Sequence, residues 1–286
     1  MKPLGRFIAL SILLIASSAH AAQTIAVATL SSAPAIDGEL SDWPTNWVKI
    51  AIKDAIEGDK KNRTGEIEAE LQAVVVGDRI YIAARWPDTS ENRNYKPWEW
   101  RKTKYKRGKD REDMFAVRFD MGGDFKTCMI TEADYDVDVW LWSAARTDPH
   151  SYASDMWHKI TLNPIEDAAE YETDSGVVVY IKKGADEGRP GYKNAKVKNR
   201  KKFQGDELPS IDLSRSPKGS VADVAAKGVW KEGFWQLEFS RQLNTGNSDD
   251  VALDAVDSIR GQIAVFNQGF AEHKSVSGEL VFSFSK

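Results

Sequence analysis

The chain has 286 residues, 42% of them hydrophobic, and a formal net charge of −4. This composition is sufficient for a sizeable buried core, and the acidic balance excludes a general polyanion-binding protein. The single cysteine, Cys128, excludes an internal disulfide, so packing alone must stabilise the fold. An unpaired thiol is usually buried and inert, and we expect this of Cys128 rather than a reactive or dimer-forming thiol.

Residues 1–21 have the pattern of an export signal. A basic start and an apolar run at 7–15 precede Ala19-His20-Ala21, which has the small-x-small form of a cleavage site. The run is shorter than the ~20 residues that cross a bilayer as a helix. We therefore expect a periplasmic protein that does not span the membrane, with residues 22–286 as one domain. Export also argues against a nucleic-acid partner.

Segments with strand-like alternation follow through the rest of the chain, and helical periodicity is scarce. Turn signals such as Gly77-Asp78 and Lys231-Glu232-Gly233 join neighbouring segments into hairpins. The expected strands cover residues 24–30, 66–76, 79–86, 114–120, 177–181, 262–267 and 278–284, with a hairpin over 228–241. This pattern predicts an all-β protein, an immunoglobulin-like or carbohydrate-binding-module-like β-sandwich with long loop insertions.

The strand expected at 114–120 has two chemically different faces. Successive side chains of a strand alternate between its faces. One face therefore carries Met114, Ala116, Arg118 and Asp120, and the other carries Phe115, Val117 and Phe119.

The stretch from Cys128 to Asp155 holds most of the residues that indicate a site. Met129 offers a soft thioether in a short loop, and Trp140 and Trp142 follow on the next expected strand. A thioether beside indoles and acids indicates a cofactor pocket rather than a hydrolytic site. The acids are Asp134, Asp136 and Asp138. Alternate acids on a strand usually form a solvated face, and a calcium site is the alternative.

No combination of residues indicates catalysis. The chain lacks a Ser/His/Asp order, a Walker loop and zinc-ligand spacing, and it has only four histidines. We therefore do not expect an enzyme.

Several blocks, in order along the chain, resemble one known family. The longest is VDVWLWSAARTDP at 137–149. The others are IDGELSDW at 36–43, RWPDTSEN at 85–92, RED at 111–113, AKGVWKEGFW at 226–235 and RQLNTG at 241–246. Together they resemble the haem-binding domain of ethylbenzene-dehydrogenase-type gamma subunits and of their c-type cytochrome relatives, over nearly the whole mature chain.

The resemblance implies a haem, and one departure from it implies which kind. The c-type relatives carry Cys-x-x-Cys-His in the central loop, where this chain has Cys128-Met129-Ile130-Thr131-Glu132. Without the second cysteine and the histidine, that covalent attachment is not available. The gamma subunits bind haem b non-covalently through a methionine and a lysine. The resemblance therefore implies non-covalent haem b, with Met129 as the first iron ligand.

The second iron ligand is left open between two neighbours. Lys274 would match the chemistry of the gamma subunits, whereas His273 is the more ordinary haem ligand. A ligating lysine must lose its proton, so it would be desolvated and its pKa lowered. His158 and Lys159 are reserve candidates.

Two basic insertions, residues 101–109 and 193–202, stand out from the acidic chain. They are either solvated loops or surfaces that dock an acidic redox partner or pair with haem propionates. The resemblance implies a periplasmic electron-transfer protein or subunit whose partner is a molybdenum enzyme subunit or a cytochrome. One alternative is a haem-free β-sandwich that binds a carbohydrate or other ligand, with Trp98 and Trp100 as stacking platforms. Another is a structural accessory subunit.

Overall fold

The computed structural model describes residues 22–269 and 273–285. The N-terminal half contributes β1 (Gln23–Thr29), β2 (Val48–Asp54), β3 (Ile67–Val76), β4 (Arg79–Pro87), β5 (Trp98–Arg101), β6 (Lys104–Arg107), β7 (Met114–Gly123) and β8 (Tyr135–Ser143). The rest contributes β9 (Tyr152–Thr161), β10 (Ala169–Glu172), β11 (Val178–Ala185), β12 (Lys193–Asn194), β13 (Glu207–Leu208), β14 (Ile211–Asp212), β15 (Val224–Lys231), β16 (Phe234–Gln242), β17 (Ser258–Phe266), β18 (Ser275–Ser277) and β19 (Leu280–Phe284).

Helical structure in the described residues is limited to four short 3-10 helices. They are η1 (Leu40–Asp42), η2 (Asp148–His150), η3 (Ser220–Ala222) and η4 (Leu253–Ala255). The all-β prediction is therefore confirmed. The expected export signal lies outside the described residues, and no helix within them has the length and apolar character needed to cross a membrane.

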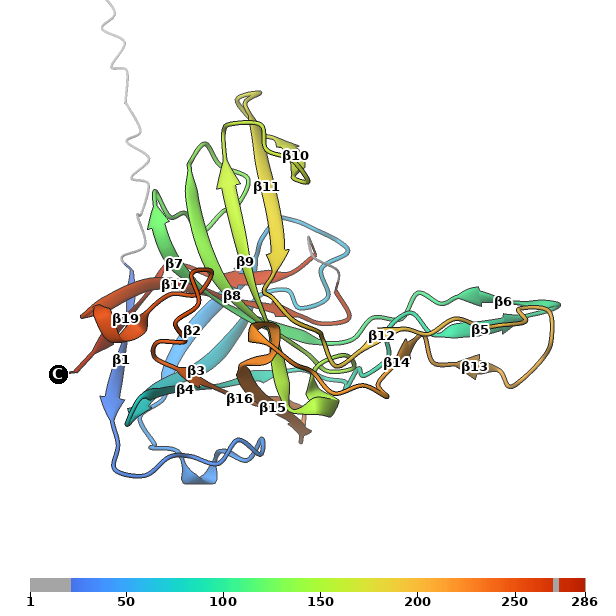
Figure 1. Cartoon of the computed structure of the whole chain (residues 1–286), viewed down its shortest axis with the longest axis horizontal. Coiled ribbons are helices and arrows are strands. Elements are labelled where there is room, and N and C mark those ends of the chain that lie inside the picture. Colours follow the sequence, from blue (N-terminus) through green and yellow to red (C-terminus); the bar gives the residue numbers. More distant parts are fainter. Residues whose placement is uncertain (1–21, 270–272, 286) are drawn as a thin grey trace, which may run out of the picture.

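The main sheet has 14 strands and closes on itself. One layer runs through β2, β3, β4, β16 and β15, and the other through β17, β7, β8, β9 and β11 (Figure 1). The layers join twice, because β17 pairs with both β18 and β7, and β9 pairs with both β8 and β15. Buried residues of both layers, among them Leu71, Ile82 and Val265, form the main core between them. This arrangement confirms the sandwich prediction.

The alternation predicted for residues 114–120 is present in β7. Phe115, Val117 and Phe119 are fully buried in the main core. Met114, Ala116 and Arg118 point to the opposite face, away from that core. The strand thus divides the layer into a side that stabilises the sandwich and a side that is free to form a site.

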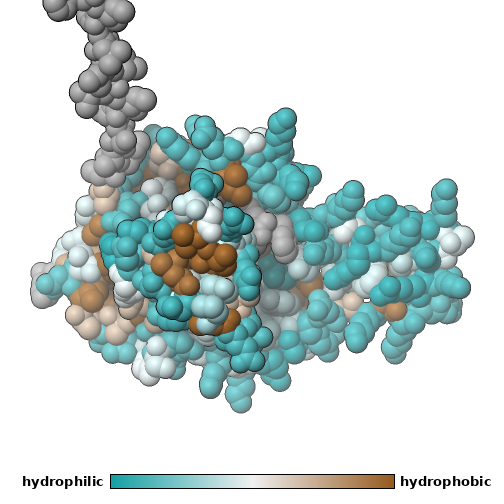
Figure 2. Space-filling model, turned by 90° about the horizontal axis from the view of Figure 1, so that it is seen from above, coloured by the Kyte–Doolittle hydropathy of each residue, from teal (hydrophilic) through white to brown (hydrophobic). Residues whose placement is uncertain are grey.

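The basic insertions fold together, whereas the sequence predicts separate loops. β5 and β6 form a hairpin, and β13 pairs with β5. The guanidinium groups of Arg107 and Arg200 lie 4.8 and 4.4 Å from the ring centre of Trp98, one from each insertion. We call residues 97–109 and 195–208 the extension. It projects from the body (Figure 1), and its surface is mostly hydrophilic, whereas exposed hydrophobic residues gather over the body (Figure 2).

Candidate functional site

A cavity of about 480 Å³ lies on the face of β7, β8, β9 and β17 that points away from the main core. This volume is within the roughly 300–1,000 Å³ of small-molecule and cofactor sites. Its apolar lining includes Ala116 from β7, Leu141 from β8 and Ala264 from β17. Ile56 and Ile130 also line it and are exposed to solvent. Exposed branched aliphatic side chains at a cavity wall are typical of a surface that a bound ligand covers.

The loop that carries Met129 is tied to the sheet by Arg118. One terminal nitrogen of Arg118 donates hydrogen bonds to the carbonyls of Lys126 and Thr127, at 2.7 and 2.8 Å. The hydroxyl of Tyr135 donates to the carbonyl of Lys126 as well, at 3.2 Å. These contacts fix the backbone just before Met129, whose side chain lines the cavity.

Lys274, one of the two candidates for the second ligand, lines the same cavity from the segment that leads into β18. Its ammonium lies 5.9 Å from the centre of the Phe266 ring, which is also part of the lining. His273 is not among the lining residues. Its Nδ1 lies 2.7 Å from a carboxylate oxygen of Asp59. Met129 and Lys274 therefore line one cavity, whereas His273 is hydrogen-bonded to Asp59 and is not part of the lining.

His158 lines the cavity from β9. Its Nδ1 is buried without a hydrogen-bond partner among the described residues. Burial, and then the nearby charges of Lys183, Arg118 and Lys274, lower the pKa of His158 to about 3. The imidazole is therefore neutral at physiological pH, with a ring nitrogen available to a ligand. Lys159 instead reaches Asp136 at 3.2 Å, outside the cavity.

Positive charge dominates the cavity walls. The charged lining residues are Arg111, Glu112, Arg118, Arg146, Lys183 and Lys274. The one acid is already engaged, since Glu112 pairs with Arg146 and accepts hydrogen bonds from the amides of Ala145 and Arg146 at 2.7 and 3.1 Å. Two nitrogens of Arg118, Nε and Nη1, are buried without partners in the described part of the chain. An apolar pocket rimmed by cations suits a flat apolar ligand that carries carboxylates.

Three other expectations from the central stretch need correction. Cys128 is exposed rather than buried, and it lines the cavity. Asp138 is fully buried and pairs with Arg241 at 2.8 Å, because the side chain of Asp138 points to the main core. The three alternating acids therefore form neither one solvated face nor one cation site. Asp134 instead accepts hydrogen bonds from the hydroxyl of Thr161 and the amide of Leu162.

Trp98 also differs from the prediction. It is 6% exposed, and the two arginines of the extension cover its ring. It is therefore not available as a stacking platform for a sugar. Trp100 is only partly buried but packs edge-on against Tyr105 and Phe203.

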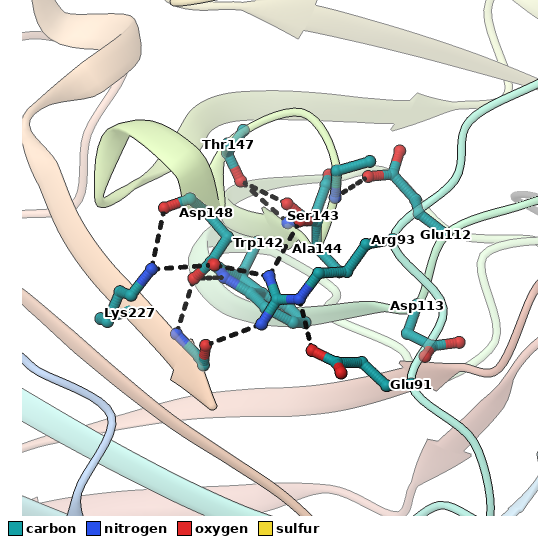
Figure 3. A network of polar contacts seen from close by, with 12 residues as sticks. Glu91, Arg93, Glu112, Asp113, Trp142, Ser143, Ala144, Thr147, Asp148 and Lys227 are labelled. Carbon is teal, nitrogen blue, oxygen red and sulfur yellow. Dashed lines mark hydrogen bonds and ion pairs between the residues drawn. The ribbon is translucent and has the colours of Figure 1, made fainter. Parts of the chain in front are cut away.

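The longest of the sequence blocks contributes Leu141 and Arg146 to the cavity, and its last residues form a buried polar hub (Figure 3). Asp148, 2% exposed, accepts hydrogen bonds from the indole of Trp142 at 3.0 Å and the amide of Gly228 at 2.7 Å. It also pairs with Arg93 at 2.7 Å and Lys227 at 3.0 Å. A side chain at Gly228 would collide with the Trp142 ring, since an added Cβ would lie 2.4 Å from it.

Residues 40–277 match the sequence model of the ethylbenzene dehydrogenase family. The chain belongs to the ethylbenzene dehydrogenase family. A comparison with curated protein sequences gives no match. Among solved structures, similar ones are a carbohydrate-binding module of family 9 from Caldicellulosiruptor kristjanssonii in complexes with glucose and with cellotriose. Both are 10% identical over 92% of this chain, with TM-scores of 0.37, and the match covers 97% and 95% of those chains. At these scores we draw nothing from the likeness.

Two more blocks matched to the ethylbenzene dehydrogenase family also have structural roles. Glu238 accepts hydrogen bonds from the amide of Gly38 at 2.6 Å and the indole of Trp43 at 2.6 Å, which fixes the first block against β16. Asp113 accepts from the amides of Asn92 and Gln268 at 2.8 and 2.9 Å. The cavity residues Arg118, Lys183 and His158 lie outside the blocks. Only their period-two placement on strands could have indicated a shared face.

Proposed function

We propose that this protein is a periplasmic electron-transfer protein that binds haem b non-covalently in the cavity, with Met129 and Lys274 as the iron ligands. The observation that carries the proposal is that these two residues, far apart in the sequence, line one cavity. Haem b in this cavity would supply a one-electron redox centre, and thioether ligation raises its reduction potential.

The lining fits such a group in three respects. The sheet side of the cavity is apolar, with Ala116 and Leu141 as examples, and offers a flat surface to a macrocycle. The buried Arg118 has donors without partners in the described residues, and Arg111 and Lys183 add charge that suits propionates. The neutral His158 has an unpaired ring nitrogen and is a reserve iron ligand.

Reconstitution of the full chain with haemin tests the proposal. Acid-acetone should extract the bound haem, because no covalent link forms. The reduced wild-type protein should resist carbon monoxide, since both axial positions are filled. Lys274→Ala should open one position, so that carbon monoxide binds and shifts the reduced spectrum.

Two matched variants separate Lys274 from the other candidates. His273→Ala changes the residue directly before Lys274. The His273 ring is hydrogen-bonded to Asp59, so this variant should leave the haem spectrum unchanged. His158→Ala should also leave the iron closed to carbon monoxide. Carbon monoxide binding in His158→Ala but not in Lys274→Ala would move the second ligand to His158. Protein that takes up no haem would refute the proposal.

The first ligand is tested through the reduction potential. Met129→Ala removes the thioether and should lower the potential on the order of 100 mV. Redox titration of the reconstituted protein measures this change, with Met156→Ala as control because Met156 lines the same cavity. Equal shifts in both variants would contradict ligation by Met129.

The alternative function is binding of a sugar without haem. It has less support from the described residues, because Trp98 is buried and Trp100 packs against two rings. Calorimetric titration of the haem-free protein with glucose and cellotriose tests it. Heat from either sugar, together with failure of haem uptake, would favour the binding module.

A further inference from the structure

Six aspartates gather around Arg241, apart from the cavity. They are Asp138, Asp155, Asp186, Asp223, Asp249 and Asp250. They come from β8, β9, the end of β11, the end of η3 and the loop between β16 and η4. One guanidinium therefore pairs with three of these six carboxyl groups.

Arg241 neutralises the carboxylates on only one side of this cluster. It is fully buried and pairs with Asp138 at 2.8 Å, Asp155 at 3.1 Å and Asp250 at 3.2 Å. Its guanidinium thus occupies the place of a cation among these three carboxylates. Asp186 and Asp249 lie beyond its ion pairs.

Asp186 lies on the side of the cluster that Arg241 does not pair with. It is 6% exposed, and both of its carboxylate oxygens are buried without a hydrogen-bond partner among the described residues. One of its oxygens lies within 4.8 Å of carboxylate oxygens of Asp249 and Asp250. Burial, and then the charges of Asp249 and Asp250, raise the pKa of Asp186 to about 8. Leaving a buried carboxylate unpaired is costly unless a cation or a proton neutralises it.

We propose that Asp186, Asp249 and Asp250 bind one calcium ion. Calcium takes six to eight oxygen ligands at about 2.3–2.6 Å, and carboxylates are its usual ligands. Zinc prefers sulfur and imidazole ligands, whereas the proposed ligands are all carboxylates. Magnesium keeps several waters, for which a buried site offers little room.

The calcium ion has a structural role in this geometry. The loop after β16 is already ordered by contacts to Asp250, from the hydroxyl of Thr245 at 2.5 Å and the side-chain Nδ2 of Asn247 at 3.1 Å. Calcium joins this loop to the end of β11 through Asp186. It therefore fastens the β16–η4 loop to the opposite layer of the sandwich, independently of haem.

Calcium titration of the full chain after treatment with a chelator tests the proposal. Calorimetry should show one ion per chain, and saturating calcium should raise the melting temperature by about 5 °C at a hundredfold excess over Kd. Asp186→Asn and Asp249→Asn should each remove most of the heat and of the thermal shift. The control is Asp136→Asn, which alters an exposed acid that pairs with Lys159 and should change neither.

The readout is the difference between calcium and chelator, not the melting temperature itself. Asp186→Asn replaces a buried carboxyl that has no hydrogen-bond partner in the described residues, and this change can stabilise the chelated protein on its own. Should that variant fail to fold, Asp249→Asn, at a less buried position, answers the same question. Absence of calcium binding in the wild type, or wild-type affinity in both variants, would overturn the proposal. Tighter binding of magnesium than of calcium would overturn the choice of metal.

Discussion

Arg118 illustrates how one side chain can set the geometry of a ligand loop. Its guanidinium bridges two successive carbonyls, and a lysine ammonium cannot reproduce that planar fork. Arg118→Lys should therefore loosen the segment before Met129 and weaken haem binding about tenfold, equivalent to roughly 1.4 kcal/mol. Haem titration followed by absorbance measures the affinity.

Arg85→Lys is the matched control, because Arg85 pairs with Glu70 and covers the Phe234 ring outside the cavity. It should keep the wild-type affinity. Equal affinities for Arg118→Lys and the wild type would show that the loop holds its shape without the fork.

Buried acids make a pH dependence predictable at the residue scale. Burial raises the pKa of Asp113 and of Glu238 to about 7, although hydrogen bonds to both carboxyls act in the opposite direction. Burial, and then the charges of Asp249 and Asp250, raise the pKa of Asp186 to about 8. A carboxyl with a raised folded pKa stabilises the fold fully below its unfolded pKa, and this stability is lost as the pH rises through the folded value. The chelated, haem-free protein should therefore become less stable between pH 6.5 and 8.

The titration of His158 does not affect stability in the range between pH 6.5 and 8. Its pKa is lowered in the fold, so its contribution is present above about 6.5 and is lost only as the pH falls toward 3. Each carboxyl can change the free energy of unfolding by up to about 1.4 kcal/mol per pH unit. Chemical denaturation at several pH values measures the slope, and Asp186→Asn should flatten it above pH 7. Stability that rises with pH in this window would contradict the prediction.

At the element scale, Asp148 connects η2 to β15 and to β8. Asp148→Asn leaves Arg93 and Lys227 without their carboxylate and should lower the free energy of unfolding by about 3 kcal/mol. Urea denaturation measures the loss. Asp136→Asn, which breaks an exposed ion pair, should cost less than about 1 kcal/mol.

Haem affinity separates this structural role from a ligand role. Asp148 is not part of the cavity lining, so the folded Asp148→Asn protein should bind haem as the wild type does. A large loss of haem affinity with little loss of stability would place the hub within the site.

The elements differ in how far the sequence could predict them. The alternation in β7 was sufficient to predict which side chains face the core, because the two faces of the strand differ strongly in polarity. It failed for β8, where Asp138 shares the core face with Trp140 and needs Arg241 from β16, which no local pattern shows. The extension was missed as a β-structure because Trp98 is shielded by arginines rather than by apolar neighbours. Met129 and Lys274 were named from family resemblance, and the cavity depends on strands that are far apart in the sequence.

At the scale of the whole molecule, the extension begins at the cavity. Tyr95 and Arg111 line the cavity and flank the β5–β6 hairpin in the chain. A partner bound to the extension would thus lie near the proposed redox centre. Changing the exposed Lys102, Lys201 and Lys202 to glutamate reverses three charges of the extension. This triple variant should associate with a co-purifying acidic redox partner about tenfold more slowly at low salt.

Stopped-flow measurement of electron transfer at several salt concentrations gives this rate. Wild-type association should slow as salt rises, because the Debye length falls to about 8 Å at physiological ionic strength. The matched control changes Lys53, Lys60 and Lys231 to glutamate. These three lysines are exposed and lie outside the extension. Equal effects of the two triple variants would assign the attraction to overall charge rather than to the extension.

The pairing of β1 with β19 affects how the protein can be truncated and how it folds. Residues Gln23–Val27 lie parallel to Leu280–Phe284, so the first and last of the described strands are neighbours in the sheet. The ribosome synthesises β19 long after β1, so this edge of β1 has no partner until β19 has been made. Parallel pairing across nearly the whole sequence has a high contact order and slows folding. A nascent or truncated chain would therefore expose Ile25 and Val27 on an open strand edge, where self-association begins.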